Sequence, residues 1–527
     1  MARRSRAGMW VIDGLILASW FLMVGLAVVH EQGLWGGLPR IARTIPAPLE
    51  IREQWCGVYY QGRKIGFTSV TLVPHEQDGV PGVAITDRGQ LRFSLLGAPQ
   101  RIDLHAWAFI DADRQLNAFT AVVQTEGSQL KIEGKRQGDA VAVTLSSPTS
   151  SWTQRIPDPS GKLWLSGLSS WATFHQLEVG QWGYLVILNP LALKPEQVHF
   201  AVRRRETFAG AEALVIETDY LGLSTTTWMT PEGAVLKETS PMGWELIREP
   251  KEQAMAMEAQ ASEALDLLST VSVRADLSGL AAQAPHDAAS MLADPASLTR
   301  LTVLVDGFSA DDVPVDRRPW QEFLSADLLS RFGQERPPGR WCLIRLERLP
   351  RALDYPTHPA PPTRYVSPSP FVQSNHPRIR DRAERITASL TDPLAQAEAL
   401  CDWVYRTLTK RLTIGLPSAT DVLANPVGDC HEHTVLFTAL ARSLGIPTRM
   451  MAGLVAYEGR FYYHAWPEVW VAGTTGGSLG VWIPLDPTLG EHRANPTHLG
   501  LAEAENETLV SLAQFVGRLH LRVLEIQ

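Results

Sequence analysis

Between Ile51 and Glu249, β-forming residues come in short runs that are separated by turn residues. Two of these runs, Thr225–Met229 and Ala234–Lys237, flank the turn sequence Pro231-Glu232-Gly233, as the two strands of a hairpin do. We therefore predict a large antiparallel β domain in this part of the chain.

The pattern changes after this region. Residues 252–268 are rich in alanine, glutamate and methionine, which predicts a helix or a helical linker. Strand-like runs at Leu301–Val305 and Trp341–Leu346 then predict a second, smaller unit.

A cluster of prolines between residues 356 and 370 marks the clearest boundary in the chain. This density disfavours regular helix and sheet and favours an extended spacer. Beyond it, Ile379–Leu390 and Pro393–Thr409 carry apolar residues at helical spacing. A third helix is predicted to begin near Cys430, and strands return from Arg449 onward.

The predicted organisation has six parts. They are a cytoplasmic tip with a transmembrane anchor at 1–31, an antiparallel β domain at 32–250, a helical linker at 251–275, a small β-containing domain at 276–355, a proline-rich linker at 356–370 and a C-terminal α+β domain at 371–527.

The anchor prediction rests on the first thirty residues. Arg3, Arg4 and Arg6 precede an apolar run, Gly8–Val29, which only Asp13 interrupts. About 20 apolar residues span a bilayer, and the positive-inside rule places the arginines in the cytoplasm and the rest of the chain across the membrane. A cleaved signal peptide is the alternative, but no small-x-small cleavage site follows the run.

Composition and charge narrow the function classes. With 45% hydrophobic and 20% charged residues, the 527-residue chain is typical of folded globular proteins rather than disordered ones. A net charge of -8 and no stripe of basic and aromatic residues argue against nucleic-acid binding. The four cysteines are far apart without a C-x-x-C pair, so neither a zinc ribbon nor a dense disulfide framework is predicted.

Cys430 differs from the other cysteines because helix-start signals surround it. Gly428 allows a tight turn, Asp429 can cap the helix, and Glu432 stands where a capping box has its partner. The sequence at 445–447, Gly-Ile-Pro, ends the helix. Backbone amides and the macrodipole at a helix start favour an anion, so a thiolate is favoured at Cys430. Cys342 and Cys401 are predicted to be buried small hydrophobes.

A base and an orienting carboxylate are predicted downstream. Phe461–Val471 and Gly480–Asp486 flank a glycine-rich turn and should pair as an antiparallel hairpin. With the turn centred near Thr475, His464 lies opposite Asp486 with Cβ atoms about 5 Å apart. A slip of one residue would break this contact.

Four sequence blocks resemble the transglutaminase-like superfamily of papain-fold thiol enzymes. They are Gly428-Asp429-Cys430, the stretch 440–447, the stretch His464-Ala465-Trp466-Pro467-Glu468-Val469-Trp470, and Trp482 with Asp486-Pro487-Thr488. The resemblance implies a papain-like core in which Cys430 is the nucleophile, His464 the general base and Asp486 the orienting carboxylate.

Other polar residues near these blocks have simpler interpretations. Asp429 is a rival orienter for the histidine, but its capping position disfavours that role. Glu468 is interpreted as a satisfied residue at a sheet edge. His431 and His433 line the cleft or are solvated, and the H-E-H spacing disfavours a shared metal ion because residues two apart point to different sides of a helix. We predict no metal and no cofactor.

The oxyanion donors are harder to place. The Cys430 backbone N–H is one candidate. Relatives often add an aromatic donor upstream, but Trp403 is interpreted as helix core, and Trp466, Trp470 and Trp482 as walls of the core or the cleft.

The resemblance implies an enzyme that attacks peptide or carboxamide carbonyls through a thioester, with protein or peptide substrates. The stretch 59–66 is similar to sequence found ahead of the catalytic domain in some membrane-anchored bacterial relatives. Together with the predicted anchor, the resemblance implies a bacterial inner-membrane protein with its bulk in the periplasm. No EF-hand-type calcium loop is present, which favours hydrolysis over calcium-dependent crosslinking. The alternatives are a catalytically silent scaffold and a metal-dependent hydrolase.

Overall fold

The computed structural model describes most of the chain. The described residues are 31–32, 52–95, 98–125, 128–158, 163, 177–189, 193–220, 223–240, 243–256, 272–280, 287–310, 318–349, 358–359, 361–411, 417–472, 479–504, 515 and 518–527. The predicted anchor at 8–29 lies outside them. Within these ranges, no helix has both the length and the apolar content that crossing a membrane requires.

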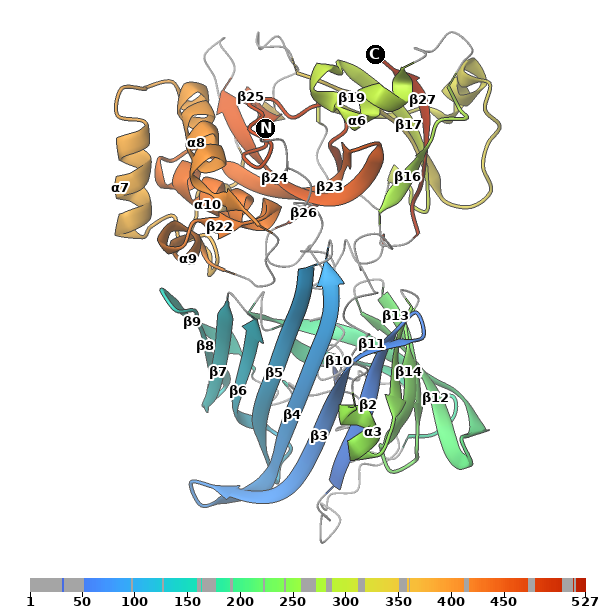
Figure 1. Cartoon of the computed structure of the whole chain (residues 1–527). Coiled ribbons are helices and arrows are strands. Elements are labelled where there is room, and N and C mark those ends of the chain that lie inside the picture. Colours follow the sequence, from blue (N-terminus) through green and yellow to red (C-terminus); the bar gives the residue numbers. More distant parts are fainter. Residues whose placement is uncertain are drawn as a thin grey trace. The chain divides into compact units, whose positions relative to one another are not determined.

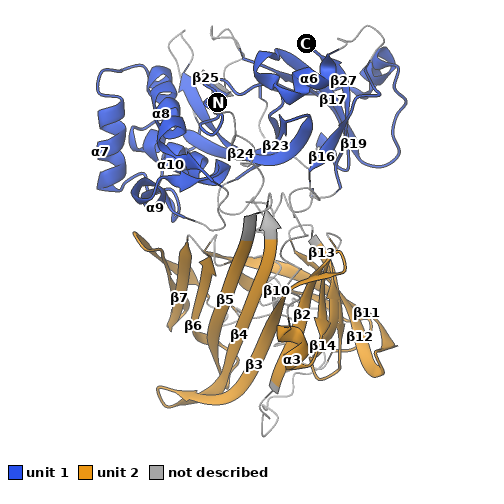
Figure 2. Cartoon of the chain, viewed as in Figure 1, with its two compact units in different colours: residues 1–14, 268–527 blue, residues 15–267 orange. Residues whose placement is uncertain are grey.

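Two compact units make up the chain (Figure 2). One contains residues 15–267, and the other contains residues 268–527 together with 1–14. Both are built mainly from antiparallel strands, as predicted, with the helices concentrated in the C-terminal unit (Figure 1).

The N-terminal unit is one large antiparallel sheet. Its order among the described strands is β1, then β10 to β15, then β2 to β9. The strands are β1 (Glu31–Gln32), β2 (Arg52–Tyr60), β3 (Arg63–Gln77), β4 (Val80–Leu95), β5 (Ala98–Asp111), β6 (Leu116–Thr125), β7 (Gln129–Gln137), β8 (Ala140–Ser146), β9 (Ser151–Pro157), β10 (Trp182–Asn189), β11 (Lys194–Phe208), β12 (Ala211–Tyr220), β13 (Leu223–Met229), β14 (Val235–Thr239) and β15 (Trp244–Arg248). The predicted hairpin across Pro231 is confirmed, because β13 pairs antiparallel with β14.

A short helix, α3 (Lys251–Met255), follows the last strand of this sheet. It covers the start of the helix predicted at 252–268, and the rest of that segment lies outside the described residues.

The C-terminal unit contains a second sheet and its helices. The sheet order is β18-β19-β17-β27-β16-β24-β23-β26, and β25 pairs with both β24 and β20. The strands are β16 (Val273–Asp276), β17 (Arg300–Asp306), β18 (Gln321–Leu324), β19 (Trp341–Glu347), β20 (His358–Pro359), β23 (Thr448–Tyr457), β24 (Arg460–Ala472), β25 (Leu479–Pro484), β26 (Leu499–Glu503) and β27 (His520–Ile526), with β21 (Thr409–Lys410) and β22 (Val427–Gly428) as a separate parallel pair.

The helices of this unit are α6 (Ala288–Ala293), α7 (Pro377–Ile386), α8 (Pro393–Thr407), α9 (Ala419–Ala424) and α10 (Cys430–Ser443), with 3₁₀ turns at η1 (Pro295–Ser297), η3 (Ala326–Phe332) and η4 (Thr363–Tyr365). Helices α7 to α10 lie together beside β24, whereas α6 lies apart from them and contacts β23 (Figure 1). The three helices predicted from periodicity correspond to α7, α8 and α10. Helix α10 is the centre of this layer, since it contacts α7, α8, α9, β23 and β24.

The predicted small domain at 276–355 shares its sheet with the C-terminal domain. Strand β17 pairs with both β19 and β27. Strand β16, which covers the end of the segment predicted as a helical linker at 251–275, pairs with β24 and β27. The strands before and after the helices thus form one continuous sheet. Pairings this distant in sequence have no local signature.

The extended spacer predicted at 356–370 is wrong in part. His358 and Pro359 pair with Gly480 and Leu479 of β25, and Tyr365 is buried, with its hydroxyl donating to Glu503. Proline is tolerated on an outer strand because its missing N–H is not needed for the ladder there. The segment therefore packs onto the C-terminal unit.

Candidate active site

The start of α10 has the capping geometry that the sequence predicts. The Asp429 carboxylate accepts a hydrogen bond from the His431 N–H at 2.9 Å, and the Glu432 carboxylate accepts one from the Asp429 N–H at 2.8 Å. A Cβ at Gly428 would lie 2.3 Å from the Glu432 Cβ, so only glycine fits in front of the cap. Cys430 is therefore fixed as the first residue of the helix.

The end of α10 is equally well defined. The Gly445 N–H donates to the Arg442 carbonyl and the Ile446 N–H to the Ala441 carbonyl, with Gly445 at φ +79°. This pair of bonds is a Schellman motif, which needs a residue in the left-handed region. Both ends of the helix that carries Cys430 are thus set by local sequence.

A hydrogen bond joins α10 to β24 beside His464. The Thr434 hydroxyl donates to the Ala465 carbonyl at 3.2 Å. Thr434 is four residues after Cys430, and residues at this spacing share one face of a helix. The face that carries Cys430 is therefore the face that meets β24 where His464 lies.

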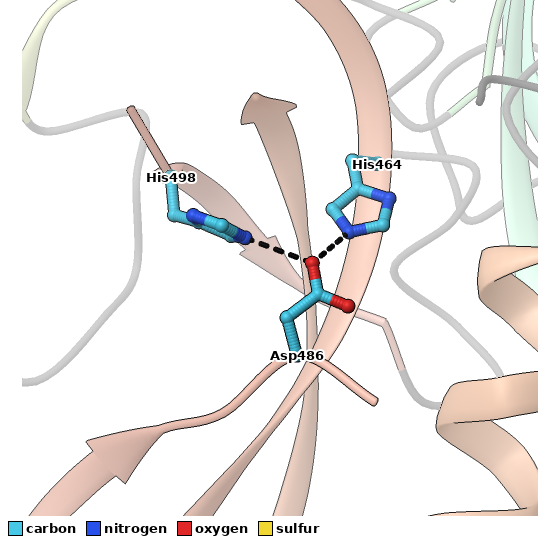
Figure 3. A group of neighbouring side chains, drawn as sticks. All are labelled: His464, Asp486 and His498. Carbon is cyan, nitrogen blue, oxygen red and sulfur yellow. Dashed lines mark hydrogen bonds and ion pairs between the residues drawn. The ribbon is translucent and has the colours of Figure 1, made fainter. Parts of the chain in front are cut away.

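His464 and Asp486 are in direct contact, as predicted (Figure 3). Their Nε2 and Oδ2 atoms are 2.7 Å apart, and both side chains are fully buried. A carboxylate accepts hydrogen bonds and does not donate them, so Nε2 carries the hydrogen. Nδ1 is then the nitrogen that accepts a proton from another group.

Backbone amides hold the other oxygen of Asp486. The Thr488 N–H donates to Oδ1 at 2.7 Å and the Leu489 N–H at 3.0 Å. Burial alone would raise the pKa of Asp486, but His464 and His498 hold it well below its usual value. For His464, burial lowers the pKa, and the neighbouring Asp486 opposes that effect. The carboxylate is therefore ionised and rigidly held behind His464.

The observed register of β24 and β25 differs from the register that was used to predict this contact. Glu468 pairs with Pro484 and Trp470 with Trp482, so residue 464 corresponds in register to residue 488 rather than 486. A slip of two residues keeps the same sheet face, whereas a slip of one would reverse it. Asp486 follows the end of β25, forms an isolated bridge with Glu491, and from there contacts His464.

A second histidine, missed by the sequence analysis, shares the same carboxylate. The His498 Nε2 atom is 3.1 Å from Asp486 Oδ2. The Trp466 ring stacks on His464 with centroids 6.0 Å apart and meets His498 edge-on at 5.0 Å. His498 belongs to the loop before β26, and no local motif links it to Asp486. Only the tertiary fold brings it there.

His464, Asp486 and His498 lie close enough together to be considered as a metal site, with ligand atoms within 4.8 Å of one another. Tetrahedral zinc, with bonds of about 2.0–2.1 Å, separates its ligand atoms by about 3.3 Å. The 2.7 Å between His464 Nε2 and Asp486 Oδ2 is shorter and is the length of a charge-assisted hydrogen bond. The geometry fits shared hydrogens better than a shared ion.

His431 and His433 were expected to line the cleft or to be solvated; both are buried, so the solvated alternative is wrong. His433 is in contact with the Asp429 carbonyl through Nδ1. Burial lowers the pKa of His433 to about 4. The Asp429 carboxylate accepts a hydrogen bond from the His431 N–H and caps α10. His464 bonds to Asp486 and not to its rival Asp429.

Glu468 is not at a sheet edge, because β24 lies between β23 and β16 and also pairs with β25. Its carboxylate accepts from Arg449 Nε at 2.8 Å, with both side chains almost fully buried. The Arg449 guanidinium lies 4.2 Å from the centre of the Trp482 ring. The two-residue turn Glu458-Gly459 sets the register that pairs Arg449 with Glu468. This turn is the sequence signal from which the ion pair could have been predicted.

The remaining cysteines have structural positions. Cys56, Cys342 and Cys401 are buried and not disulfide-bonded. Burial raises the pKa of each thiol, to about 11 for Cys56. Trp403 is half-buried on α8, where the Arg382 guanidinium lies 5.1 Å from its ring.

Comparison with known proteins places one segment of the chain in a family. Residues 380–487 match the transglutaminase-like superfamily, so the chain contains a transglutaminase-like domain. The match includes Cys430, His464 and Asp486. No curated protein matches the chain.

Three solved structures illustrate the range of structural likenesses. A putative cysteine protease from Cytophaga hutchinsonii is 16% identical, with 44% of this chain and 86% of that chain covered and a TM-score of 0.26. A beta-barrel-like protein of a domain of unknown function from Brucella abortus is 11% identical, covering 38% and 95%, with a TM-score of 0.28. A putative protease from Parabacteroides distasonis is 10% identical, covering 82% and 69%, with a TM-score of 0.17. TM-scores this low do not establish a common fold.

Proposed function

We propose that the transglutaminase-like domain is a thiol acyl-transfer enzyme that cleaves peptide or carboxamide bonds. Cys430 Sγ attacks the carbonyl carbon while His464 Nδ1 takes the thiol proton. The C–N bond then breaks, the leaving amine receives that proton, and the acyl group stays on sulfur as a thioester. Water, or a second amine, attacks the thioester and releases Cys430.

The observation that carries this proposal is the buried hydrogen bond between His464 and Asp486. His464 lies on β24, the strand that α10 contacts. Asp486 fixes the ring so that Nε2 carries a hydrogen and Nδ1 can act as the base. The Thr434–Ala465 hydrogen bond holds the Cys430 face of α10 against the same strand. Capping of α10 at Asp429 orients backbone amides toward the developing negative charge.

Hydrolysis is the favoured outcome of the thioester. A calcium-dependent crosslinker needs oxygen ligands for calcium, and the sequence contains no EF-hand-type acidic loop. The proposed substrates are therefore proteins or peptides, with water as the acceptor.

A membrane anchor is part of the proposal. The apolar run Gly8–Val29 follows three arginines, which supports a single-pass protein whose catalytic domain is on the periplasmic side of a bacterial inner membrane. The full chain should then stay with membranes in high salt and be released by detergent. A variant that lacks residues 1–31 should be released without detergent.

The reaction can be tested with denatured casein and a fluorescent primary amine as probes. The full chain should release casein peptides and incorporate little amine into casein. Cys430→Ala should abolish peptide release, whereas Cys401→Ala, which removes a buried thiol on the neighbouring helix α8, should retain it. Peptide release that survives Cys430→Ala would contradict the proposal, and dominant amine incorporation would reassign the enzyme as a transferase.

One observation favours a second candidate, a binding protein with a silent triad. Cys430 is only 1% exposed, so a substrate reaches its sulfur only after local opening. If Cys430 stays unmodified by iodoacetamide under conditions that keep the chain folded, the site does not open and the scaffold is favoured.

A further inference from the structure

The ring of His498 lies between two atoms that can only accept hydrogen bonds. Nδ1 is 3.0 Å from the Asn495 carbonyl oxygen, and Nε2 is 3.1 Å from Asp486 Oδ2 (Figure 3). A neutral imidazole has one N–H, so one of these contacts would bring two lone pairs together. Since the ring is 1% exposed, water cannot relieve that conflict.

The charges around His498 favour a second proton on its ring. Burial alone would lower the pKa of His498, but Asp486 and Glu491 together raise it above the ordinary value. His464 faces it from β24, and Trp466 packs edge-on against it. Glu491 is held nearby by hydrogen bonds from the Asn495 backbone and side chain.

We propose that His498 is a positioning residue of the active site: an imidazolium ion that shares the Asp486 carboxylate and keeps His464 in its neutral, proton-accepting form. This inference rests on the proposed function for its catalytic meaning. Asp486 then serves two histidines, one fixed and charged and one that exchanges protons with Cys430. The site at rest then holds His464 as a neutral base.

The size of the effect follows from the separation of the two rings. Their centroids are 5.7 Å apart. Two unit charges at that distance, with an effective dielectric constant of about 20, repel enough to lower the His464 midpoint by about two pH units. Burial, the largest influence on the pKa of His464, acts in the same direction. Both effects leave His464 neutral near pH 7.

Nuclear magnetic resonance of the full chain, labelled with ¹⁵N in its histidine rings, tests this directly. The signals of His498 and His464 are assigned by their loss in His498→Gln and His464→Gln. At pH 7 both ring nitrogens of His498 should show the chemical shifts of protonated nitrogens. His464 should show one protonated and one unprotonated nitrogen. An unprotonated nitrogen on His498 at pH 7 would overturn the proposal. If His498→Gln does not fold, loss of the same signals in folded His498→Asn gives the assignment.

A pair of matched variants tests the influence on His464. His498→Gln should raise the His464 titration midpoint by about two pH units. His492→Gln removes another histidine–aspartate hydrogen bond, to Asp402 at 2.8 Å, and should leave the His464 midpoint unchanged. An unmoved midpoint in folded His498→Gln would also overturn the proposal. Because ring protons are read without turnover, an inactive protein with a doubly protonated His498 would refute the proposed function alone.

Discussion

Replacing Asp486 by asparagine is the most informative single change in the site. The carboxylate accepts four hydrogen bonds, from His464 Nε2, His498 Nε2, and the backbone N–H groups of Thr488 and Leu489. An asparagine amide nitrogen cannot accept any of them. If its oxygen keeps the two backbone bonds, its NH₂ group faces both histidine nitrogens.

The expected losses can be estimated from these contacts. A buried donor left without an acceptor costs about 1–3 kcal/mol, and removing one partner of a buried charge pair costs about 3–5 kcal/mol. We expect Asp486→Asn to lower the free energy of unfolding of the C-terminal unit by about 3–5 kcal/mol. His464 would also take the other tautomer, with its hydrogen on Nδ1, so turnover should fall by about 10²–10⁴-fold.

Asp402→Asn provides the matched control. Its carboxylate bonds to His492 at 2.8 Å, but both side chains are about one-third exposed. A pair of this kind contributes at most about 1 kcal/mol. Hydrogen exchange of the α10 and β24 amides gives the stability change, and release of casein peptides gives the activity. Equal effects of the two variants on both readings would refute the reasoning about Asp486.

Three further predictions concern two buried groups and the expectation that no metal ion takes part in the reaction. The pKa of His433 falls from 6.5 to about 4 on folding, so the unfolded chain binds more protons than the folded chain in that interval. The free energy of unfolding should therefore fall by about 3 kcal/mol from pH 6.5 to pH 4 in unfolding titrations. The fall should be smaller in His433→Gln. Arg449→Met removes the nearer of two guanidinium groups beside buried Glu468, since Arg318 Nε lies 3.8 Å from the same carboxylate. The variant should cost up to about 3–5 kcal/mol in the free energy of unfolding, and the loss should be smaller when Glu468 is already leucine; equal losses in the two backgrounds would contradict the ion pair. Chelators should leave casein cleavage unchanged. Cleavage that is lost with a chelator and restored by zinc would instead favour a metal site at His464, Asp486 and His498.

Local signals predicted the parts of the site that depend on neighbouring residues. The Asp429–Glu432 capping box is set within one helical turn, and it forms as expected. The contact between His464 and Asp486 was predicted from hairpin geometry, and it survived an error of two residues because strand faces alternate with period two. Periodicity and turn chemistry were sufficient there.

The features that the sequence did not predict depend on contacts between residues far apart in the chain. β17 pairs with β27 through Val303 and Val523, which joins the predicted small domain to the C-terminal sheet. His498 meets Asp486 only because the loop after β25 returns past β24. Glu468 was assigned to an edge because only the pairing with the strand at 480–486 was predicted, and not the pairing of β24 with β23 and β16.

Alkylation of the full chain by iodoacetamide, with each cysteine mapped by mass spectrometry, tests the central claim most directly. Cys56, Cys342 and Cys401 are internal controls, because burial raises the pKa of each. At pH 7, Cys430 should react faster than all three and should lose that advantage in His464→Gln. Reaction of Cys430 no faster than the controls, or at an unchanged rate in His464→Gln, would contradict the claim that His464 activates Cys430.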